Sequence, residues 1–395
     1  MQSLPPVRIA VVAGEVSGDA LGAGLLKALK ERIPDIQCEG IGGPEMIAQG
    51  CRSLFPMERL SVLGITEVFG RYFEISGIRR RLLKHFLSDP PDLFIGIDSS
   101  GFNLGLEQKL KRAGIPTVHY VSPQVWAWRG WRIRKIRQAV DHILVLFPFE
   151  EKYYRAKQVP VTFVGHPLAD QIPDEPDRDA FRRKLKLRLD ATIIALLPGS
   201  RTSELKAHAG LFVRTALWLY ARNKQLSFIA PFVNRQTRVI FEDAIKKNDA
   251  WDLPMTRMFG HSHDAMAASD IVLLASGTAA LEAALLKRLM VVTYKVSFFS
   301  HLLIKMFSQV KLYSMPNHLA GQELVPELLQ RNAVPQKLGK TIEYYLSNPA
   351  RAELIRNEYQ KIHDQLRCNA DERAAEAVVA LLQKTARVKK TRKTG

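Results

Sequence analysis

Cysteine is scarce in this chain of 395 residues and occurs only at Cys38, Cys51 and Cys368. An odd number of widely spaced cysteines supports neither a disulfide framework nor a Cys-x-x-Cys metal or redox site. The sequence therefore predicts a protein of a reducing compartment.

Long apolar runs are also missing. The longest candidate, residues 297–307, is interrupted by His301 and Lys305 and is shorter than the roughly 20 residues that a spanning helix needs. Residues 1–6 contain no basic region, and the apolar run at 9–13 is too short for a signal peptide. We therefore expect no transmembrane helix and no export, which indicates a cytoplasmic protein.

Acidic residues are outnumbered by basic ones, 39 against 57, which gives a net charge of +18. Such an excess attracts an anionic partner, either nucleic acid or an anionic membrane surface. Basic residues gather at 79–84, 129–137 and 384–393. The last cluster follows the final apolar helix, so residues 385–395 are predicted to form a basic disordered tail.

The chain is long enough for two or three domains at roughly 150 residues each. Residues 8–13 and 192–197 are apolar strands, and each is followed by a glycine-containing loop and then a helical pattern. Residues 172–179 between the two halves are polar and twice interrupted by proline, which is typical of a linker.

Further strands alternate with helix-length segments in both halves. They are expected at 93–97, 117–121, 142–146, 226–230, 271–275 and 290–294. This alternation predicts an α/β protein with two doubly wound, Rossmann-like domains that face each other across a cleft, with ligands at the carboxyl ends of the strands. The expected domains are 1–170 and 171–340, with C-terminal helices at 341–384.

Two loops of the second half suit a diphosphate. Ser276, Gly277 and Thr278 form a small-residue turn between a strand and a helix, where backbone N–H groups and hydroxyls meet a positive helix end. Glu282, one turn into that helix, could accept hydrogen bonds from ribose hydroxyls. A plain helix cap with a small packing face is the alternative.

The second of these loops follows the strand at 192–197. Gly199 permits close approach, and after Ser200 the guanidinium of Arg201 can bind phosphate oxygens and neutralise a leaving diphosphate. A capping box within residues 202–204 is the alternative, and it is compatible with phosphate binding.

In the first half, Asp98 follows the strand at 93–97. A carboxylate there can take a proton from an attacking hydroxyl, although an aspartate after a strand is also a common helix cap. The loop at 14–19 has neither a G-x-G-x-x-G nor a Walker A pattern, so it does not indicate a nicotinamide site. Ser17 or Asp19 capping the first helix explains that loop.

Aromatic and basic residues lie together in two places. Residues 122–137 interleave tryptophans such as Trp126 and Trp128 with cationic side chains, which suits single-stranded nucleic acid, a sugar, a membrane interface or plain core packing.

His261 and His263 have no carboxylate cluster at a supporting spacing, so no metal site is predicted.

The second place is an apolar stretch that directly precedes three arginines, an arrangement that suits insertion into an anionic membrane face. Burial of a helix in the core is the alternative. The predicted membrane-contact residues are Val62, Leu63, Ile65, Val68, Phe69, Phe73, Arg79, Arg80 and Arg81. Four or five basic contacts at ~1 kcal/mol each would supply ~4–5 kcal/mol.

Seven segments together resemble the lipid-A-disaccharide synthase family, which consists of two-domain glycosyltransferases of the GT-B type. In chain order they are 13–19, 40–46, 122–128, 165–168, 197–205, 276–282, and 316–321 with 326–330. A single segment is a weak signal, but seven in the family's order are specific.

The resemblance implies that an acylated UDP-sugar, UDP-linked 2,3-diacylglucosamine, donates its sugar to the 6-hydroxyl of an acylated sugar phosphate, 2,3-diacylglucosamine 1-phosphate. The products are a β-1,6 disaccharide of lipid A (lipopolysaccharide) biosynthesis and UDP. Acylated substrates would place the enzyme at the inner face of the cytoplasmic membrane as a peripheral protein, monomeric or homodimeric. No metal, redox cofactor or nucleic acid is implied.

By position, the resemblance makes Asp98 the candidate base of an inverting transfer and Arg201 the group that assists departure of the diphosphate. The residues that it places at the substrates or UDP are Ser17, Gly18, Asp19, Gln124, Gly199, Ser200, Arg201, Ser276, Gly277, Thr278, Glu282 and Asn317.

Two features depart from the family pattern. Ser100 and Gly101 stand where the family usually has Pro-Asp, and His318 stands where an apolar residue is usual. The alternatives are another GT-B enzyme that acts on UDP-N-acetylglucosamine, either an epimerase or a lipid II-forming transferase, and a basic nucleic-acid-binding protein.

Overall fold

The computed structural model describes residues 7–60, 65–123, 125, 132–275, 277–295 and 312–394, without the side chains of 65–72 and 387–394. It divides the chain into two compact units. Unit 1 consists of Met1–Asp170 with Leu366–Gly395, and unit 2 consists of Gln171–Gln365.

Unit 1 contains one parallel sheet among its described residues. Its strands are β1 (Arg8–Ala13), β2 (Gln37–Ile41), β3 (Cys51–Ser53), β4 (Leu93–Ile97), β5 (Thr117–Tyr120), β6 (His142–Val145) and β7 (Val161–Phe163). They pair in the order β3-β2-β1-β4-β5-β6-β7. All five residues of β4 are buried, as expected for a strand that is covered on both faces.

Helices cover both faces of this sheet. They are α1 (Val16–Arg32), α2 (Pro44–Ala48), α3 (Ile65–Ser88), α4 (Ser100–Arg112), α5 (Ile133–Ala139), α6 (Pro148–Arg155), α7 (Pro167–Gln171) and α17 (Ala370–Thr394). Val11 of β1 belongs to the core shared with α1 and α17. Its neighbour Val12 belongs to the core shared with α3 and α4 on the other face, because successive strand residues point in opposite directions.

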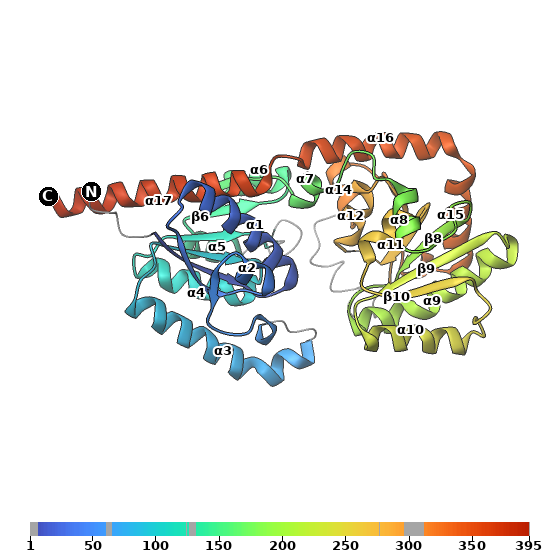
Figure 1. Ribbon diagram of the computed structural model, residues 1–395, viewed down its shortest axis with the longest axis horizontal. Coiled ribbons are helices and arrows are strands. Elements are labelled where there is room, and N and C mark those ends of the chain that lie inside the picture. Colours follow the sequence, from blue (N-terminus) through green and yellow to red (C-terminus); the bar gives the residue numbers. More distant parts are fainter. Residues whose placement is uncertain are drawn as a thin grey trace. The chain divides into compact units, whose positions relative to one another are not determined.

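Unit 2 repeats the plan with the strands β8 (Thr192–Leu197), β9 (Leu226–Phe232), β10 (Met255–Phe259), β11 (Ile271–Ala275), β12 (Leu289–Tyr294) and β13 (Glu327–Leu329). They pair in parallel in the order β10-β9-β8-β11-β12-β13. The helices are α8 (Arg178–Lys184), α9 (Thr202–Arg222), α10 (Arg235–Lys247), α11 (Ser262–Ala268), α12 (Ala279–Leu285), α14 (Met315–Ala320), α15 (Pro335–Ser347) and α16 (Pro349–Leu366). Figure 1 shows α9 and α10 side by side.

The two sheets confirm the predicted α/β class with two doubly wound, Rossmann-like sheets. In each sheet the strand order reverses next to the first strand, between β1 and β4 in unit 1 and between β8 and β11 in unit 2. Ligands of such folds bind at the carboxyl ends of the strands beside this switch point. The loops after these four strands are therefore the places to look for a site.

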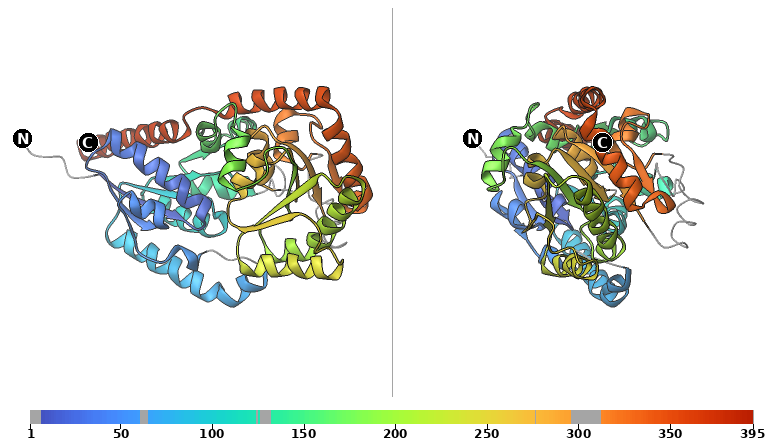
Figure 2. Two further views of the ribbon diagram at one scale, coloured as in Figure 1. Left: turned by 45° about the vertical axis from the view of Figure 1, so that its right-hand side comes forward. Right: turned by 90° about the vertical axis from the view of Figure 1, so that its right-hand side faces the viewer.

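The C-terminal end differs from the expectation. The last helices do not form a separate part, because α17 belongs to unit 1 and lies beside α1 (Figure 2). Its buried residues Ala374, Ala375 and Val378 join the core of unit 1. The helix continues to Thr394, so the prediction of a disordered tail is wrong. Lysine and arginine favour helices, and the segment contains no glycine or proline before Gly395.

Two of the three cysteines lie close together in the core, and all three are free thiols. Cys38 of β2 and Cys51 of β3 are paired in register, and their sulfur atoms lie 2.7 Å apart in the core. Contact with Cys51 and burial together raise the pKa of the Cys38 thiol. Strand pairing therefore brings together two thiols that their sequence spacing seemed to separate.

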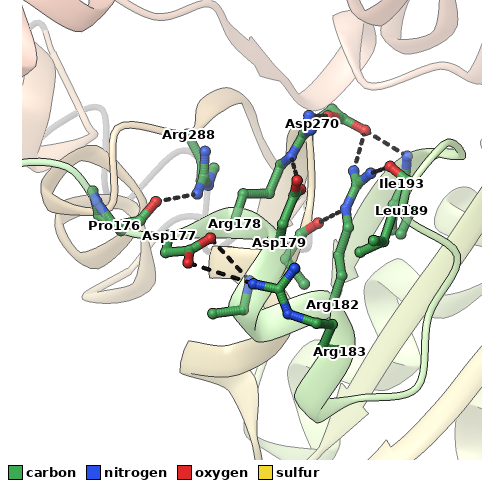
Figure 3. Close-up of polar contacts among 12 residues, drawn as sticks. Pro176, Asp177, Arg178, Asp179, Arg182, Arg183, Leu189, Ile193, Asp270 and Arg288 are labelled. Atoms are coloured by element: carbon green, nitrogen blue, oxygen red, sulfur yellow. Dashed lines mark hydrogen bonds and ion pairs between the residues drawn. The ribbon is translucent and has the colours of Figure 1, made fainter.

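The amino ends of the unit 2 strands lie opposite the carboxyl ends at which ligands are expected, and they anchor α8. Figure 3 shows Arg178 and Arg182 of α8 reaching Asp270, which directly precedes β11. Arg178 Nη1 and Arg182 Nη2 each lie 2.8 Å from this carboxylate, which also accepts the N–H of Ile193 at 2.7 Å. Asp177 caps α8, so the last residues of the predicted linker form the start of this helix.

Candidate active site

Asp98 and Ser99 directly follow β4 and have left-handed backbone conformations, with φ of 47° and 40°. Val121, directly after the neighbouring strand β5, has φ of 77°. Such values are uncommon for residues other than glycine, cost of order 1–3 kcal/mol each and gather at functional sites. A Cβ at Gly14, after β1, would overlap Ser99 Oγ, so the loops after β1 and β4 are in close contact.

Backbone hydrogen bonds hold the turn formed by Asp98 and Ser99, called here the Asp98 turn. Asp98 N donates to Tyr120 O at 2.8 Å, and the N–H groups of Phe102 and Asn103 donate to Ser99 O. The N-cap of α4 is Ser99, and its side chain makes no cap hydrogen bond. Asp98 is therefore not the N-cap of this helix, so helix capping does not explain this residue.

The loop after β1 is organised by Asp19. This side chain is 2% exposed, and both of its carboxylate oxygens accept backbone N–H groups within Gly43–Met46, at 2.8 to 3.1 Å. Asp19 therefore caps α2 rather than α1, and its oxygens are occupied. Ser17 is exposed, whereas Gly18 is buried against Ala13 and Ile97. The Asp19 carboxylate thus connects the loop after β1 to the start of α2.

In unit 2, the loop after β8 is held by Glu204. Gly199 has φ of +123°, and Glu204 Oε2 accepts the N–H groups of Ser200 at 2.9 Å and Arg201 at 3.2 Å. Arg201 is the N-cap residue of α9. Its Nη1 lies 3.6 Å from Glu204 Oε1, and the Arg201 side chain is 57% exposed. This loop therefore contains both the cap of α9 and the partly exposed positive charge of Arg201.

The loop after β11 lies at the same edge, because β8 and β11 pair directly. Gly277 and Thr278 are exposed, and α12 begins at Ala279. Glu282 in its first turn forms a 2.8 Å hydrogen bond with His263 Nδ1. The structure therefore brings the two predicted phosphate loops together within unit 2.

His263 belongs to the sequence His261-Ser-His263, for which no metal site was predicted. It directly follows the start of α11 and faces Glu282, while His261 pairs with Asp264 at 2.9 Å. No group of three potential metal ligands occurs among the described residues. Both residues of the pair can be read from the sequence, but their contact cannot, because Glu282 is 19 residues away from His263.

Asn317, which was predicted to contact UDP, makes its hydrogen bonds within the chain. It is fully buried; Nδ2 donates to Val325 O and to Glu327 Oε1, and Oδ1 accepts the N–H groups of Leu324 and Val325. All four contacts lie at 2.7 to 2.8 Å. Asn317 therefore fixes the loop before β13, and burial lowers the pKa of the neighbouring His318.

The predicted membrane-contact surface is partly described. On α3, Phe73 is 81% exposed, Arg80 and Arg81 are exposed and Arg79 is half-buried. Outside the described residues or side chains lie Val62, Leu63, Ile65, Val68, Phe69, Gln124, Trp126, Trp128 and Ser276, as well as residues 297–307. Within the described part of the chain, no helix combines the length and the apolar character needed to cross a bilayer.

Comparison with known proteins adds the identity of the family. Residues 9–379 match the family model of lipid-A-disaccharide synthetase. The lipid-A-disaccharide synthase of Methylobacillus flagellatus is 48% identical over 95% of this chain and 99% of its own length. The enzyme of Dechloromonas aromatica is 49% identical over the same shares of the two chains.

Solved structures agree on the fold. A UDP-GlcNAc 2-epimerase from Neisseria meningitidis, bound to UDP-GlcNAc, matches with a TM-score of 0.64 and 12% identity over 96% of this chain and 100% of its own. A glycosyltransferase from Rickettsia africae matches with a TM-score of 0.59 and 12% identity over 97% and 99%. These likenesses show two Rossmann-like units of the GT-B type. With the full-length sequence matches, they establish that the chain belongs to the lipid-A-disaccharide synthase family of glycosyltransferases.

Proposed function

We propose that this chain transfers 2,3-diacylglucosamine from its UDP-linked donor to the 6-hydroxyl of 2,3-diacylglucosamine 1-phosphate, with inversion at the anomeric carbon. The observation that carries the proposal is the family match over residues 9–379. The site geometry supports it, because each sheet presents a loop pair at its switch point. Relatives that are 48% and 49% identical are lipid-A-disaccharide synthases, which does not favour the alternatives.

Asp98 is the proposed base. Its carboxylate is not used to cap α4, and its turn lies at the carboxyl end of a buried strand. In the proposed step, Asp98 accepts the proton of the acceptor hydroxyl as the oxygen attacks the anomeric carbon. The new C–O bond forms opposite the bond to UDP, so an α-linked donor gives a β-linked product.

The loops of unit 2 are proposed to hold the nucleotide. Arg201 has an exposed guanidinium beside the edge that carries Gly277 and Thr278, and it would offset the negative charge that develops on the departing diphosphate. Glu282, oriented by His263, would accept hydrogen bonds from ribose hydroxyls. These roles supply positive charge and orientation from the chain itself.

Membrane contact through α3 is the third part of the proposal. Phe73 combines large exposed apolar area with the exposed cations Arg80 and Arg81 on the same helix. An aromatic side chain beside cations suits the boundary between acyl chains and anionic head groups. The enzyme would thus meet its acylated substrates at the inner face of the cytoplasmic membrane.

The test is product analysis with matched acylated donor and acceptor. Mass spectrometry should show a tetra-acyl disaccharide monophosphate together with UDP, and NMR should show a β-anomeric linkage. Unacylated UDP-N-acetylglucosamine serves as the control donor and should give little turnover. Epimerisation of that control sugar, or absence of the disaccharide from the matched pair, would reject the proposal.

A further inference from the structure

A group of three buried polar side chains lies beneath the Asp98 turn: Asn103, Glu107 and His119, called here the polar column. Each is 0% exposed. Asn103 and Glu107 are one helical turn apart on α4, so they share one face of that helix. His119 lies on β5 and is the register partner of Gly96 on β4. The column therefore lies between α4 and two central strands.

Asn103 connects this column to the strained turn. Its Nδ2 group faces three carbonyl oxygens: Val12 O at 3.3 Å, Ile97 O at 3.2 Å and Asp98 O at 3.0 Å. Its backbone N–H also donates to Ser99 O at 3.0 Å. One residue thus bonds to both left-handed residues and to the carboxyl ends of β1 and β4.

Gly96 shows how closely the column is packed on β4. A Cβ at this position would overlap Glu107 Oε1 and would lie 2.9 Å from Asn103 Cβ. Glu107 Oε1 in turn lies 2.7 Å from His119 Nδ1. Any side chain at Gly96 would therefore displace Asn103 and Glu107 together.

The column is costly to bury. Asn103 Oδ1, Glu107 Oε2 and His119 Nε2 have no hydrogen-bond partner among the described residues, although they are inaccessible to solvent. Burial raises the pKa of the Glu107 carboxyl. Proteins satisfy most buried polar groups, and the exceptions call for an explanation beyond stability. Here they adjoin the backbone that presents the candidate base.

We propose that Asn103 is a positioning residue for Asp98, and that the Glu107–His119 pair fixes the part of α4 that carries it. The amide group holds the Asp98–Ser99 turn in its left-handed conformation, and this conformation sets the direction of the Asp98 side chain. Without the amide, the turn relaxes toward negative φ and the carboxylate rotates away from its position. The inference rests on the proposed role of Asp98 as the base.

The decisive experiment is a double-mutant cycle between Asn103 and Asp98. Asn103→Ala is expected to lower kcat by about 10- to 100-fold, because a displaced catalytic group loses activity steeply, while KM for donor and acceptor changes less than about threefold. In the Asp98→Ala background the same substitution should cost almost nothing. Lys109→Ala, an exposed change on the same helix, is the matched control.

Two further variants keep the test decisive if Asn103→Ala folds poorly by circular dichroism. Asn103→Ser retains a hydroxyl donor and should recover part of kcat, while Gly96→Ala should reproduce the loss without removing a polar group. An equal loss of kcat in the presence and absence of Asp98 would overturn the inference and assign the column to stability alone. Full activity of Asp98→Ala itself would show that Asp98 is not the base, and it would thereby also refute the positioning role of Asn103.

Discussion

The two units hold their candidate site residues in different environments. In unit 1, the Asp98 turn is supported from below by Asn103, which is completely buried. In unit 2, Arg201 and Glu282 are supported by partly exposed side chains: Glu204 for the arginine and His263 for the glutamate.

This difference has a physical consequence. Hydrogen bonds in a low-dielectric interior are strong and costly to break, whereas exposed ion pairs contribute about 0–1 kcal/mol. A base must meet its proton within a few tenths of an ångström, but a flexible guanidinium can follow a diphosphate as it leaves. The rigid support therefore lies under the proposed base and the adjustable support beside the proposed nucleotide ligands.

The largest expected effect comes from removing the charged groups themselves. Asp98→Ala should lower kcat by ~10²–10⁴-fold because the acceptor hydroxyl loses its proposed general base. Arg201→Ala should cost ~10²–10³-fold in kcat and also weaken UDP binding, because the leaving charge loses a partner. Steady-state kinetics with acylated substrates and calorimetric titration with UDP measure both. A loss below threefold for Asp98→Ala, or unchanged values for Arg201→Ala, would contradict the respective assignment.

Much of the fold was predictable because its central strands are continuous apolar runs. β1, β4 to β6, β8, β9, β11 and β12 all lie where the sequence predicts strands. The missed strands are β2, β3, β7, β10 and β13, three of which have only three residues. Short strands away from the switch points carry too few apolar residues to produce a recognisable period.

The site was predictable at the level of loops but not of single side chains. Asp19 and Asn317 were expected to contact substrate. In the structure, Asp19 accepts backbone N–H groups, and Asn317 bonds to backbone groups and to the Glu327 side chain. Asp19 reaches Gly43, 24 residues away, and no local pattern reveals this pairing. The same reason hid the Glu282–His263 bond. Which polar groups remain available depends on tertiary contacts that a one-dimensional pattern does not contain.

A smaller effect should follow from loosening the surface support in unit 2. His263→Gln removes the imidazole that holds Glu282 at 2.8 Å, so donor KM should rise by about two- to fivefold with little change in kcat. His261→Gln is the matched control, because His261 pairs with Asp264 instead. Initial-rate measurements over a range of donor concentrations provide the comparison. Equal effects of the two substitutions, or a change confined to kcat, would contradict the orienting role.

The smallest expected effect concerns stability rather than catalysis. Asp371, near the start of α17, packs against Gly24 of α1. Burial, with a contribution from Asp170, raises the pKa of its carboxyl to about 6 from an ordinary value of 3.8. The folded state therefore binds this proton more tightly than the unfolded state, so stability decreases as pH rises from about 4 to about 6.

Asp371→Asn removes this dependence. Because the side chain is only half-buried, the full shift is discounted, and the variant should be about 1 kcal/mol more stable than the wild type at pH 8. Near pH 4 the two proteins should unfold alike. Urea denaturation followed by circular dichroism at both pH values measures the difference, with the exposed Asp35→Asn as control. A gain that is equal at pH 4 and pH 8 would show that ionisation of Asp371 does not weaken the contact between α17 and α1.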